Sequence, residues 1–211
     1  MNGNLLVTAS LLDNFNFYCT CPPAWKAKAL KELTATLRRE PYEVADWVKR
    51  GIDFENTVYD VCNNLQKRTA GSSYFNRVVE LCKGGDYQAK EKKYVNADGH
   101  AFVFYGKLDV KKPDEIIDIK TTLNYKGESK YLSGTQHLLY PWLTGISHFR
   151  YVVVQWENED SHQIKHVYEI ASRMTDSAKV QDALIAKAVA FTNWTIENGL
   201  YNDYYKTFSY N

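Results

Sequence analysis

The sequence lacks two features common in proteins that bind polyanions or membranes: a large net charge and a long apolar run. Its 26 lysines and arginines balance 25 aspartates and glutamates, so the formal net charge is only +1. No global field draws the chain to nucleic acid, and any such affinity must come from local patches. No segment reaches the ~18 consecutive apolar residues of a membrane span, and residues 1–12 lack the basic region and cleavage site of a signal peptide. We therefore expect a cytoplasmic protein without a membrane partner.

Cysteine and histidine are too few and too poorly spaced to suggest a zinc or iron–sulfur site. The four cysteines stand at positions 19, 21, 62 and 82, and the spacing of Cys19 and Cys21 is short for either kind of metal pair. The five histidines show no metal-ligand spacing. We expect buried thiols in a reducing cytosol.

The sequence also contains no internal repeat, low-complexity tract or obvious linker. A chain of 211 residues can bury a sizeable core, and its 45% hydrophobic and 24% charged residues are usual for a globular protein. We expect one domain over residues 1–211, with a helical N-terminal part (1–85), a sheet that carries the chemistry (86–171) and a C-terminal helix and tail (172–211).

The most informative stretch is residues 106–120, with the sequence GKLDVKKPDEIIDIK. It predicts a β-hairpin, with an apolar strand, a turn around Pro113 and a second strand over 116–121. If the turn is centred just after Pro113, Asp109 lies directly opposite Asp118, with Cβ atoms ~4.5–5.5 Å apart.

The alternation of the second strand brings a cation to the same face. Lys120 shares a face with Asp118, and in the same register it lies opposite Lys107, while Ile117 and Ile119 point the other way into a core. Two carboxylates and an ammonium are thereby placed together on a rigid sheet.

These residue types fit metal-assisted phosphodiester hydrolysis. Mg²⁺ takes oxygen ligands and keeps several waters, so a few carboxylates suffice to hold it. The metal lowers the pKa of a bound water and neutralises charge on the phosphoryl oxygens, and a nearby lysine can hold the attacking water or stabilise the developing negative charge. The alternative is a solvated hairpin with cross-strand ion pairs, and the three residues alone do not exclude it.

Two helical segments add polar groups to the hairpin. Glu55 lies in a predicted helix over residues 42–68, and Gln136 and Tyr140 share one helix face because they are four residues apart. Pro141 removes a backbone hydrogen bond and clashes with the carbonyl four residues back. The Gln136 helix must therefore kink there or begin only just before it.

Taken in order, these motifs resemble the PD-(D/E)XK nuclease superfamily, in particular its RecB-like and phage lambda-type exonuclease branch. The order is a helical Glu, then Gly-x-x-Asp ending at Asp109, then Asp-x-Lys ending at Lys120, then Gln-x-x-x-Tyr ending at Tyr140. The opening segments SLLDNF from Ser10 and CPPAWK from Cys21 are similar to the start of RecB-like nuclease domains. The resemblance covers residues 10–140.

The resemblance implies a single nuclease domain that hydrolyses DNA with one or two Mg²⁺ or Mn²⁺ ions. Lys120 would be the catalytic lysine, beside Asp118 where many members have Glu. Some RecB-like nucleases hold an iron–sulfur cluster with three cysteines near the C-terminus, and because no cysteine follows Cys82 we expect no such cluster. The implied metal ligands are Glu55, Asp109, Asp118 and the carbonyl of Ile119.

The groups expected to meet DNA lie around these acids. Gln136 and Tyr140 would orient the site or contact the DNA backbone, as the resemblance implies. The hairpin lysine Lys107 is a candidate phosphate contact, and Tyr125 and Tyr131 are candidates for stacking on bases. Other basic candidates, each equally consistent with a solvated surface, are residues 90–93, Lys111, Lys112 and Lys126.

Hydrophobic periodicity predicts an α/β (α+β) sandwich, with a mixed central β-sheet flanked by helices. The resemblance implies that this sheet is a restriction-endonuclease-like core. Ser10 is expected to cap a short first helix. The strand over 150–156 has a solid apolar run and is expected to be central. The other expected helices cover 22–39, 42–68, 73–82 and 174–197, and the other strands 88–95, 100–110, 116–121 and 164–170.

Within this class the sequence leaves several functions open. The first is an exonuclease of phage or mobile-element recombination and repair, working with DNA, a single-strand annealing or recombination protein, or further copies of itself. The alternatives are a structure-specific endonuclease or junction resolvase of the same fold, and a non-catalytic DNA-binding member.

Overall fold

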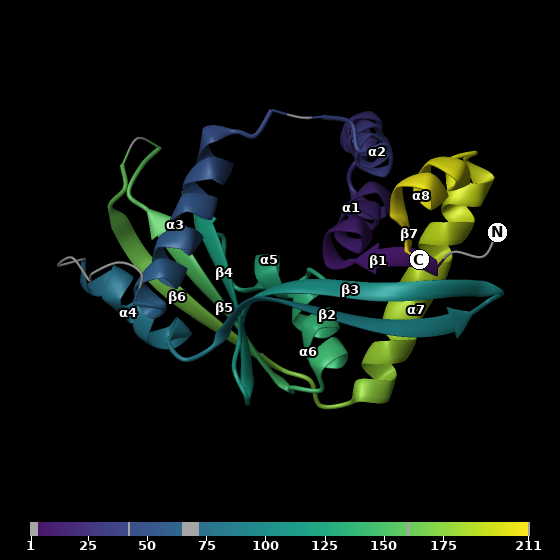
Figure 1. Cartoon of the computed structure of the whole chain (residues 1–211). Coiled ribbons are helices and arrows are strands. Elements are labelled where there is room, and N and C mark those ends of the chain that lie inside the picture. Colours follow the sequence, from purple (N-terminus) through teal and green to yellow (C-terminus); the bar gives the residue numbers. More distant parts are fainter. Residues whose placement is uncertain (1–3, 42, 65–71, 160, 211) are drawn as a thin grey trace.

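The computed structural model describes residues 4–41, 43–64, 72–159 and 161–210. Seven strands of this described part form one mixed sheet in the order β6-β5-β4-β3-β1-β7, with β2 paired to β3 (Figure 1). The strands are β1 (Asn4–Thr8), β2 (Asp86–Ala97), β3 (His100–Lys111), β4 (Glu115–Thr122), β5 (His148–Trp156), β6 (Ile164–Arg173) and β7 (Ser209–Tyr210).

Strands β2 and β3 form a long two-stranded ribbon. They pair in antiparallel fashion from Asp86 opposite Lys111 to Ala97 opposite His100. The turn residues Asp98 and Gly99 have φ angles of 50° and 74°, and positive φ at both central residues is what a two-residue type I′ hairpin turn requires. The hairpin that the sequence predicts at this point is confirmed.

Strand β3 changes its partner along its length. Residues 102–105 pair in parallel with β1, whereas β4 pairs with β3 only at Val110 opposite Ile117 and at Lys111 opposite Ile116. This pairing ends one position before Asp109 and Asp118, so their direct opposition stays a prediction. The expected opposition of Lys107 and Lys120 is wrong, because the strands separate before they reach these residues. Strand β4 pairs in parallel with β5 along its whole length, and beyond Ile117 this is the pairing that continues, so β3 and β4 separate there. We call the place where they separate the fork.

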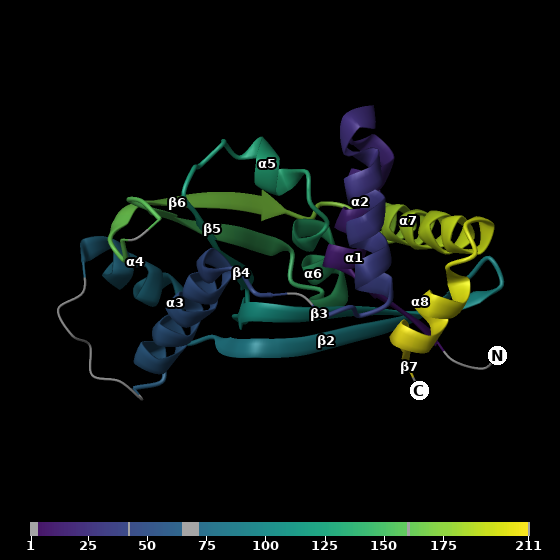
Figure 2. The same ribbon diagram turned by 90° about the horizontal axis from the view of Figure 1, so that it is seen from above.

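Helices gather at both ends of the sheet (Figures 1 and 2). The helices α3 and α4 lie by β4, β5 and β6, and α1, α2, α7 and α8 lie by β1. The helices are α1 (Ala9–Thr20), α2 (Pro23–Leu37), α3 (Asp46–Cys62), α4 (Ser73–Cys82), α5 (Ser129–Leu132), α6 (Gln136–Thr144), α7 (Ser177–Glu197) and α8 (Tyr201–Phe208).

Two hydrophobic cores lie on opposite faces of the sheet. Tyr151 and Val153 of β5 belong to the core that α1, α6 and α7 cover, whereas Val152 and Val154 belong to the core that α3 and α4 cover. A strand buried on both faces reads as an unbroken apolar run, which explains the sequence of β5. This strand is nevertheless second from the β6 edge, so the expectation of a central position is wrong.

Several expected boundaries are also wrong. Thr8, not Ser10, caps α1, because its Oγ1 accepts a hydrogen bond of 3.2 Å from the backbone N–H of Leu11. The Glu55 helix begins at Asp46 and ends at Cys62, and residues 43–45 are not helical. Tyr42 and residues 65–68 of the expected helix lie outside the described residues.

The two ends of the chain are less simply helical than expected. The N-terminal part contains strand β1, and the C-terminal part contains α8 and β7 besides the long helix α7. All four cysteines are free thiols, and Cys19 is exposed although buried thiols were expected. No helix in the described ranges is both long enough and apolar enough to cross a membrane.

Candidate active site

The fork between β3 and β4 is closed by a side chain. Oδ2 of Asp109 accepts a hydrogen bond of 2.9 Å from the backbone N–H of Ile119. The backbone ladder between the two strands ends two residues before Ile119, so this N–H is bonded to a carboxylate instead of a carbonyl. The bond fixes the position of Asp109 relative to β4.

Asp118 lies beside this fork and is almost fully buried, with 1% of its surface exposed. Its Oδ2 lies 2.7 Å from Nζ of Lys120, and its Oδ1 accepts a hydrogen bond of 3.0 Å from Nε2 of Gln136. Within the described part of the chain, Oδ2 has no hydrogen-bond donor besides that ammonium. One oxygen of a buried carboxylate therefore remains available to a further cation.

The first residue of α6 supplies the contact to Asp118. Nε2 of Gln136 also lies 3.0 Å from the hydroxyl of Tyr140, so the two residues share one helix face as predicted. Helix α6 begins at Gln136, five residues before Pro141, which is the second of the two outcomes that Pro141 allowed. The proline falls in the second turn and leaves the contacts of Gln136 intact.

Two glycines let the helices come close to the sheet. A Cβ on Gly106 of β3 would lie 2.9 Å from the ring of Tyr140, and a Cβ on Gly51 of α3 would lie 2.8 Å from Oγ1 of Thr121. Both distances are shorter than any normal carbon contact. Gly106 thus makes room for the Tyr140 ring, and Gly51 lets the helix that carries Glu55 pack directly against β4.

Glu55 lies within electrostatic range of the acids at the fork. Burial raises the pKa of Glu55 to about 7, an effect that Lys120 and Lys107 oppose and Asp118 reinforces. Since the shift reflects both desolvation and a neighbouring carboxylate, Glu55 belongs to the same charged cluster as Asp118. The effect of Lys107 on the pKa of Glu55 also places this otherwise exposed lysine near the cluster.

The remaining charges of the cluster influence one another strongly. Burial, and then the negative charges of Asp118 and Glu55, raises the pKa of Asp109 well above its ordinary value. Burial also raises the pKa of Asp118, against the attraction of Lys120. Burial alone would lower the pKa of Lys120, but the two aspartates outweigh it, so the pKa lies above its usual value. Lys120 is therefore a firmly protonated ammonium ion.

The donor atoms suit a hard divalent cation. Three carboxylates act electrostatically on one half-buried ammonium ion, which pairs with Asp118. This leaves an excess of negative charge and oxygen donors of the kind that Mg²⁺ and Mn²⁺ prefer. The side chains are not a completed ligand set, because no three acid, histidine or cysteine groups of the described residues are arranged to hold a metal. The residue types fit a divalent cation, but in this structure Asp109 and Asp118 accept hydrogen bonds from Ile119 and Gln136.

One residue that orients the site was not predicted as such. Oδ1 of Asp13 in α1 accepts a hydrogen bond of 2.6 Å from Oγ1 of Thr135, the buried residue that precedes α6. This contact spans 122 positions and ties the start of the Gln136 helix to α1. Asp13 lies in the SLLDNF segment that the sequence singles out, but only the tertiary fold gives it this partner.

The two expected stacking tyrosines pack against other aromatic rings of the protein. The ring of Tyr125 stacks on the ring of Tyr168, with centroids 3.7 Å apart and an angle of 7° between them. Tyr131 is only 9% exposed and packs in the core against Tyr151. The expectation that Tyr131 contacts DNA is therefore wrong, and one face of Tyr125 is already covered by protein.

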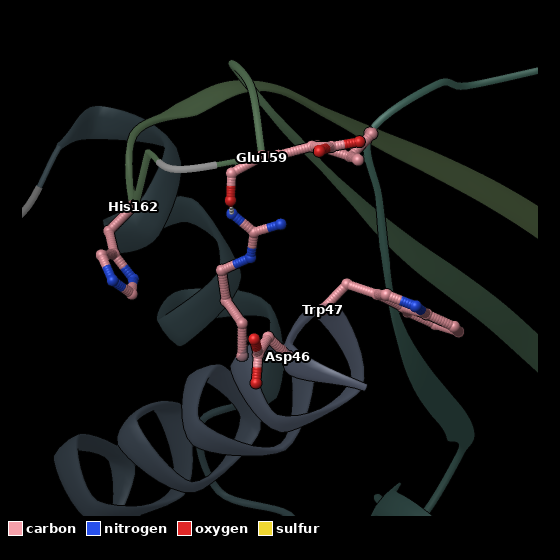
Figure 3. Close-up of a pocket in the computed structure, with 6 residues that line it drawn as sticks. Asp46, Trp47, Glu159 and His162 are labelled. Carbon is pink, nitrogen blue, oxygen red and sulfur yellow. Dashed lines mark hydrogen bonds between the residues drawn. The ribbon is translucent and has the colours of Figure 1, made fainter. Parts of the chain in front are cut away.

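A pocket of about 460 Å³ lies at the N-terminal end of α3 (Figure 3). The guanidinium of Arg50 donates to the backbone carbonyls of Asn158, Glu159 and Ser161 and so ties α3 to the loop between β5 and β6. The carboxylates of Asp46 and Glu159 are part of the lining, which makes the pocket unsuited to a phosphate group.

Comparison with known proteins gives similarity of structure but not of sequence. No protein-family model and no curated protein sequence matches the chain. The alkaline exonuclease from Laribacter hongkongensis is similar with a TM-score of 0.54 and 14% identity, covering 92% of this chain and 91% of that one. Its complex with dAMP gives a TM-score of 0.52 and 16% identity, with 92% and 89% covered.

A phage-related exonuclease from Haemophilus somnus is similar to the same extent. Its TM-score is 0.53 at 13% identity, and the match covers 92% of this chain and 96% of that one. The chain therefore has the fold of these exonucleases: a mixed sheet flanked by helices. The resemblance that the sequence motifs carry is confirmed at the level of the fold.

Proposed function

We propose that the chain is a metal-dependent deoxyribonuclease that hydrolyses phosphodiester bonds. The observation that carries the proposal is the cluster of Asp109, Asp118, Glu55 and Lys120 at the fork between β3 and β4. Folding alone gives little reason to gather two acids and a lysine from separating strands and a third acid from a helix. The fold shared with two exonucleases supports the same conclusion.

The three carboxylates and the carbonyl of Ile119 would hold one or two Mg²⁺ or Mn²⁺ ions. The bound metal would lower the pKa of a water molecule and neutralise charge on the phosphoryl oxygens. Lys120 serves as a hydrogen-bond donor and not as a base, because the neighbouring aspartates keep it protonated. Its ammonium can hold the attacking water or stabilise the charge that develops on phosphorus oxygens.

The other groups would orient the acids and bind the substrate. Gln136 holds Asp118 through a hydrogen bond, and Tyr140 supports Gln136. Lys107 is exposed next to the cluster and is suited to a DNA phosphate. Tyr125 is a further proposed contact for DNA.

We further propose that the enzyme is an exonuclease that acts in phage or mobile-element recombination or repair. Two proteins of similar structure are exonucleases, which supports the exonuclease assignment. A recombination or single-strand annealing protein and further copies of this chain are the partners that such a role suggests. A structure-specific endonuclease would share the same cluster and differ in the DNA shapes that it admits.

The decisive assay is degradation of linear, closed circular and branched DNA with Mg²⁺ or Mn²⁺, with EDTA as the metal-free control. We expect the linear DNA to be degraded from its ends, and Asp109→Ala and Lys120→Ala to abolish this activity. Cleavage of circular or branched DNA would identify an endonuclease instead. Binding without any metal-dependent product would identify a non-catalytic DNA-binding protein, and unchanged turnover in both variants would disprove the assigned roles.

A further inference from the structure

We propose that one face of the β2–β3 ribbon binds the phosphate backbone of the DNA that extends beyond the cleaved bond. The inference rests on the proposed nuclease function and names the surface that holds the substrate. The face is defined by Lys90, Lys92 and Tyr94 of β2 together with Tyr105 and Lys107 of β3, and we call it the ribbon face.

The pairing of the two strands places these residues on one side. Lys90 lies directly opposite Lys107, and Lys92 lies directly opposite Tyr105, and opposed residues of an antiparallel pair point to the same face. Burial along β2 alternates in step, with Lys90, Lys92 and Tyr94 exposed and the residues between them half-buried.

Two lysines of the ribbon are half-buried and held by other groups of the protein. Nζ of Lys93 donates to the carbonyl of Trp142 at 2.7 Å, and Lys111 forms an ion pair with Glu91. Both lysines therefore stabilise the fold and are not available to a ligand. The exposed lysines of the ribbon are Lys90, Lys92 and Lys107.

The pair of Lys90 and Lys107 has an unfavourable arrangement. Two ammonium-bearing side chains face each other across the ribbon with Cβ atoms about 4.5–5.5 Å apart, and like charges in directly opposed positions destabilise a sheet. No carboxylate of the described chain forms an ion pair with Lys90. A phosphate between the two ammonium groups would relieve their repulsion, which gives the pair a purpose that folding alone does not.

The ribbon face is continuous with the proposed active site. Lys107 is two residues from Asp109 along β3, about 7 Å at the usual rise of a strand, and Tyr105 is a further ~7 Å away. Lys107 also acts electrostatically on Glu55. Figure 1 shows the ribbon running from the fork to the far end of the sheet, so a strand of DNA cleaved at the fork can follow it.

The composition of the face favours nucleic acid as the occupant. Tyr94 is 54% exposed, and Nζ of Lys92 lies 5.5 Å from the centre of its ring. Grooves that bind single-stranded DNA combine cations for the backbone with exposed aromatic rings for the bases. The net charge of +1 makes such a local cluster the natural source of affinity.

The test is the salt dependence of DNA binding, measured with EDTA present so that cleavage does not interfere. We compare Lys90→Ala and Lys92→Ala with Lys165→Ala, which removes an exposed lysine of β6 at the opposite edge of the sheet. Each ribbon variant is expected to bind a linear oligonucleotide about two- to tenfold more weakly, with the slope of log K against log [salt] reduced by about 1. The Lys165 variant and Lys90→Arg should keep the wild-type slope.

Two further readouts separate this inference from its alternatives. Lys90→Ala should unfold at the same temperature as the wild type or slightly higher, because it removes a repulsion, so a weaker affinity would not reflect misfolding. Ribbon variants that bind with the wild-type slope would overturn the ribbon face even if the protein cleaves DNA with Mg²⁺. A reduced slope without any cleavage would support DNA binding by the ribbon face and contradict the proposed nuclease function.

Discussion

Asp109 and Ile119 are joined by a hydrogen bond of 2.9 Å from the backbone N–H of Ile119 to the carboxylate of Asp109. The bond crosses the point where β3 and β4 separate and brings an acid of one strand against the acid–x–lysine segment of the other. An asparagine can accept the same hydrogen bond but carries no charge. The two roles of Asp109, holding the fork and supplying negative charge, can therefore be separated by one substitution.

Asp109→Asn should make the metal-free protein more stable while it abolishes DNA cleavage. The substitution keeps the contact to Ile119 and removes one of three crowded carboxylates, and burial raises the pKa of each of them. Like charge adds to the shift of Asp109 and of Glu55. We expect a gain of about 1–2 kcal/mol at pH 8 by urea denaturation with EDTA, and a loss of cleavage of at least about a hundredfold. A variant that is less stable, or one that keeps full activity, would contradict this assignment.

Gly51→Ala tests the close contact between α3 and β4. Within a helix, alanine is intrinsically better than glycine by about 1 kcal/mol, but here its Cβ would lie 2.8 Å from Oγ1 of Thr121. We expect a net destabilisation of about 1–3 kcal/mol and a loss of activity, because the displaced helix carries Glu55.

The matched control for that variant is the same substitution with Thr121→Ala. Removing Oγ1 removes the clash, so Gly51→Ala should become neutral or stabilising by up to about 1 kcal/mol in this background. Thermal unfolding of the four proteins measures the coupling. If Gly51→Ala is equally harmful with and without the Thr121 hydroxyl, the proposed contact does not restrict the helix.

Gln136→Ala should weaken activity without unfolding the protein. The substitution removes the hydrogen bond to Oδ1 of Asp118, and groups that orient metal ligands typically change metal affinity or activity by about 10–100-fold. Tyr140→Phe is the comparison, because it keeps the ring packed against Gly106 and loses only the hydroxyl next to Gln136. We expect a smaller loss of activity from Tyr140→Phe than from Gln136→Ala. The measurement is the cleavage rate as a function of Mg²⁺ concentration. Full activity of both variants would show that α6 does not orient the site.

The stability of the metal-free protein should fall as pH rises from about 4.5 to about 7. The pKa of Glu55 is raised from 4.5 to about 7 in the folded state, so within this window the folded protein binds more protons than the unfolded chain, and each rise in pH favours unfolding. Because Glu55 is half-buried, we expect its share to be only about 1–3 kcal/mol. The difference in the free energy of unfolding between wild type and Glu55→Gln isolates the contribution of Glu55. A difference that does not change with pH would contradict the raised pKa of Glu55.

Local patterns in the sequence predict the centre of the candidate site. The alternation of apolar and polar residues around Pro113 suffices to oppose Asp109 to Asp118, because side-chain direction in a strand has a period of two. The helical spacing of Gln136 and Tyr140 is equally local. In the structure Gln136 contacts Tyr140, and Asp109 reaches β4 at Ile119, while the backbone pairing of the two strands ends one position before the two aspartates.

Contacts between distant segments were beyond the reach of such patterns. The hydrogen bond from Thr135 to Asp13 depends on how α1 meets α6, and the space between Gly51 and Thr121 depends on how α3 meets β4. Strand β1 is a five-residue segment, NLLVT, and so short an apolar run is compatible with a strand or a helix. Its parallel pairing with β3, about a hundred positions away, decides between them.

Titration of the protein with Mn²⁺ by calorimetry at pH 7 tests most directly whether the charged cluster at the fork is a metal site. The account predicts binding of one or two ions with release of protons, since burial raises the pKa of Glu55 to about 7 and leaves this carboxyl partly protonated without metal. It also predicts that Asp118→Asn, which keeps the shape of the side chain, loses this binding. The absence of binding in the wild type, or unchanged binding in Asp118→Asn, would contradict it.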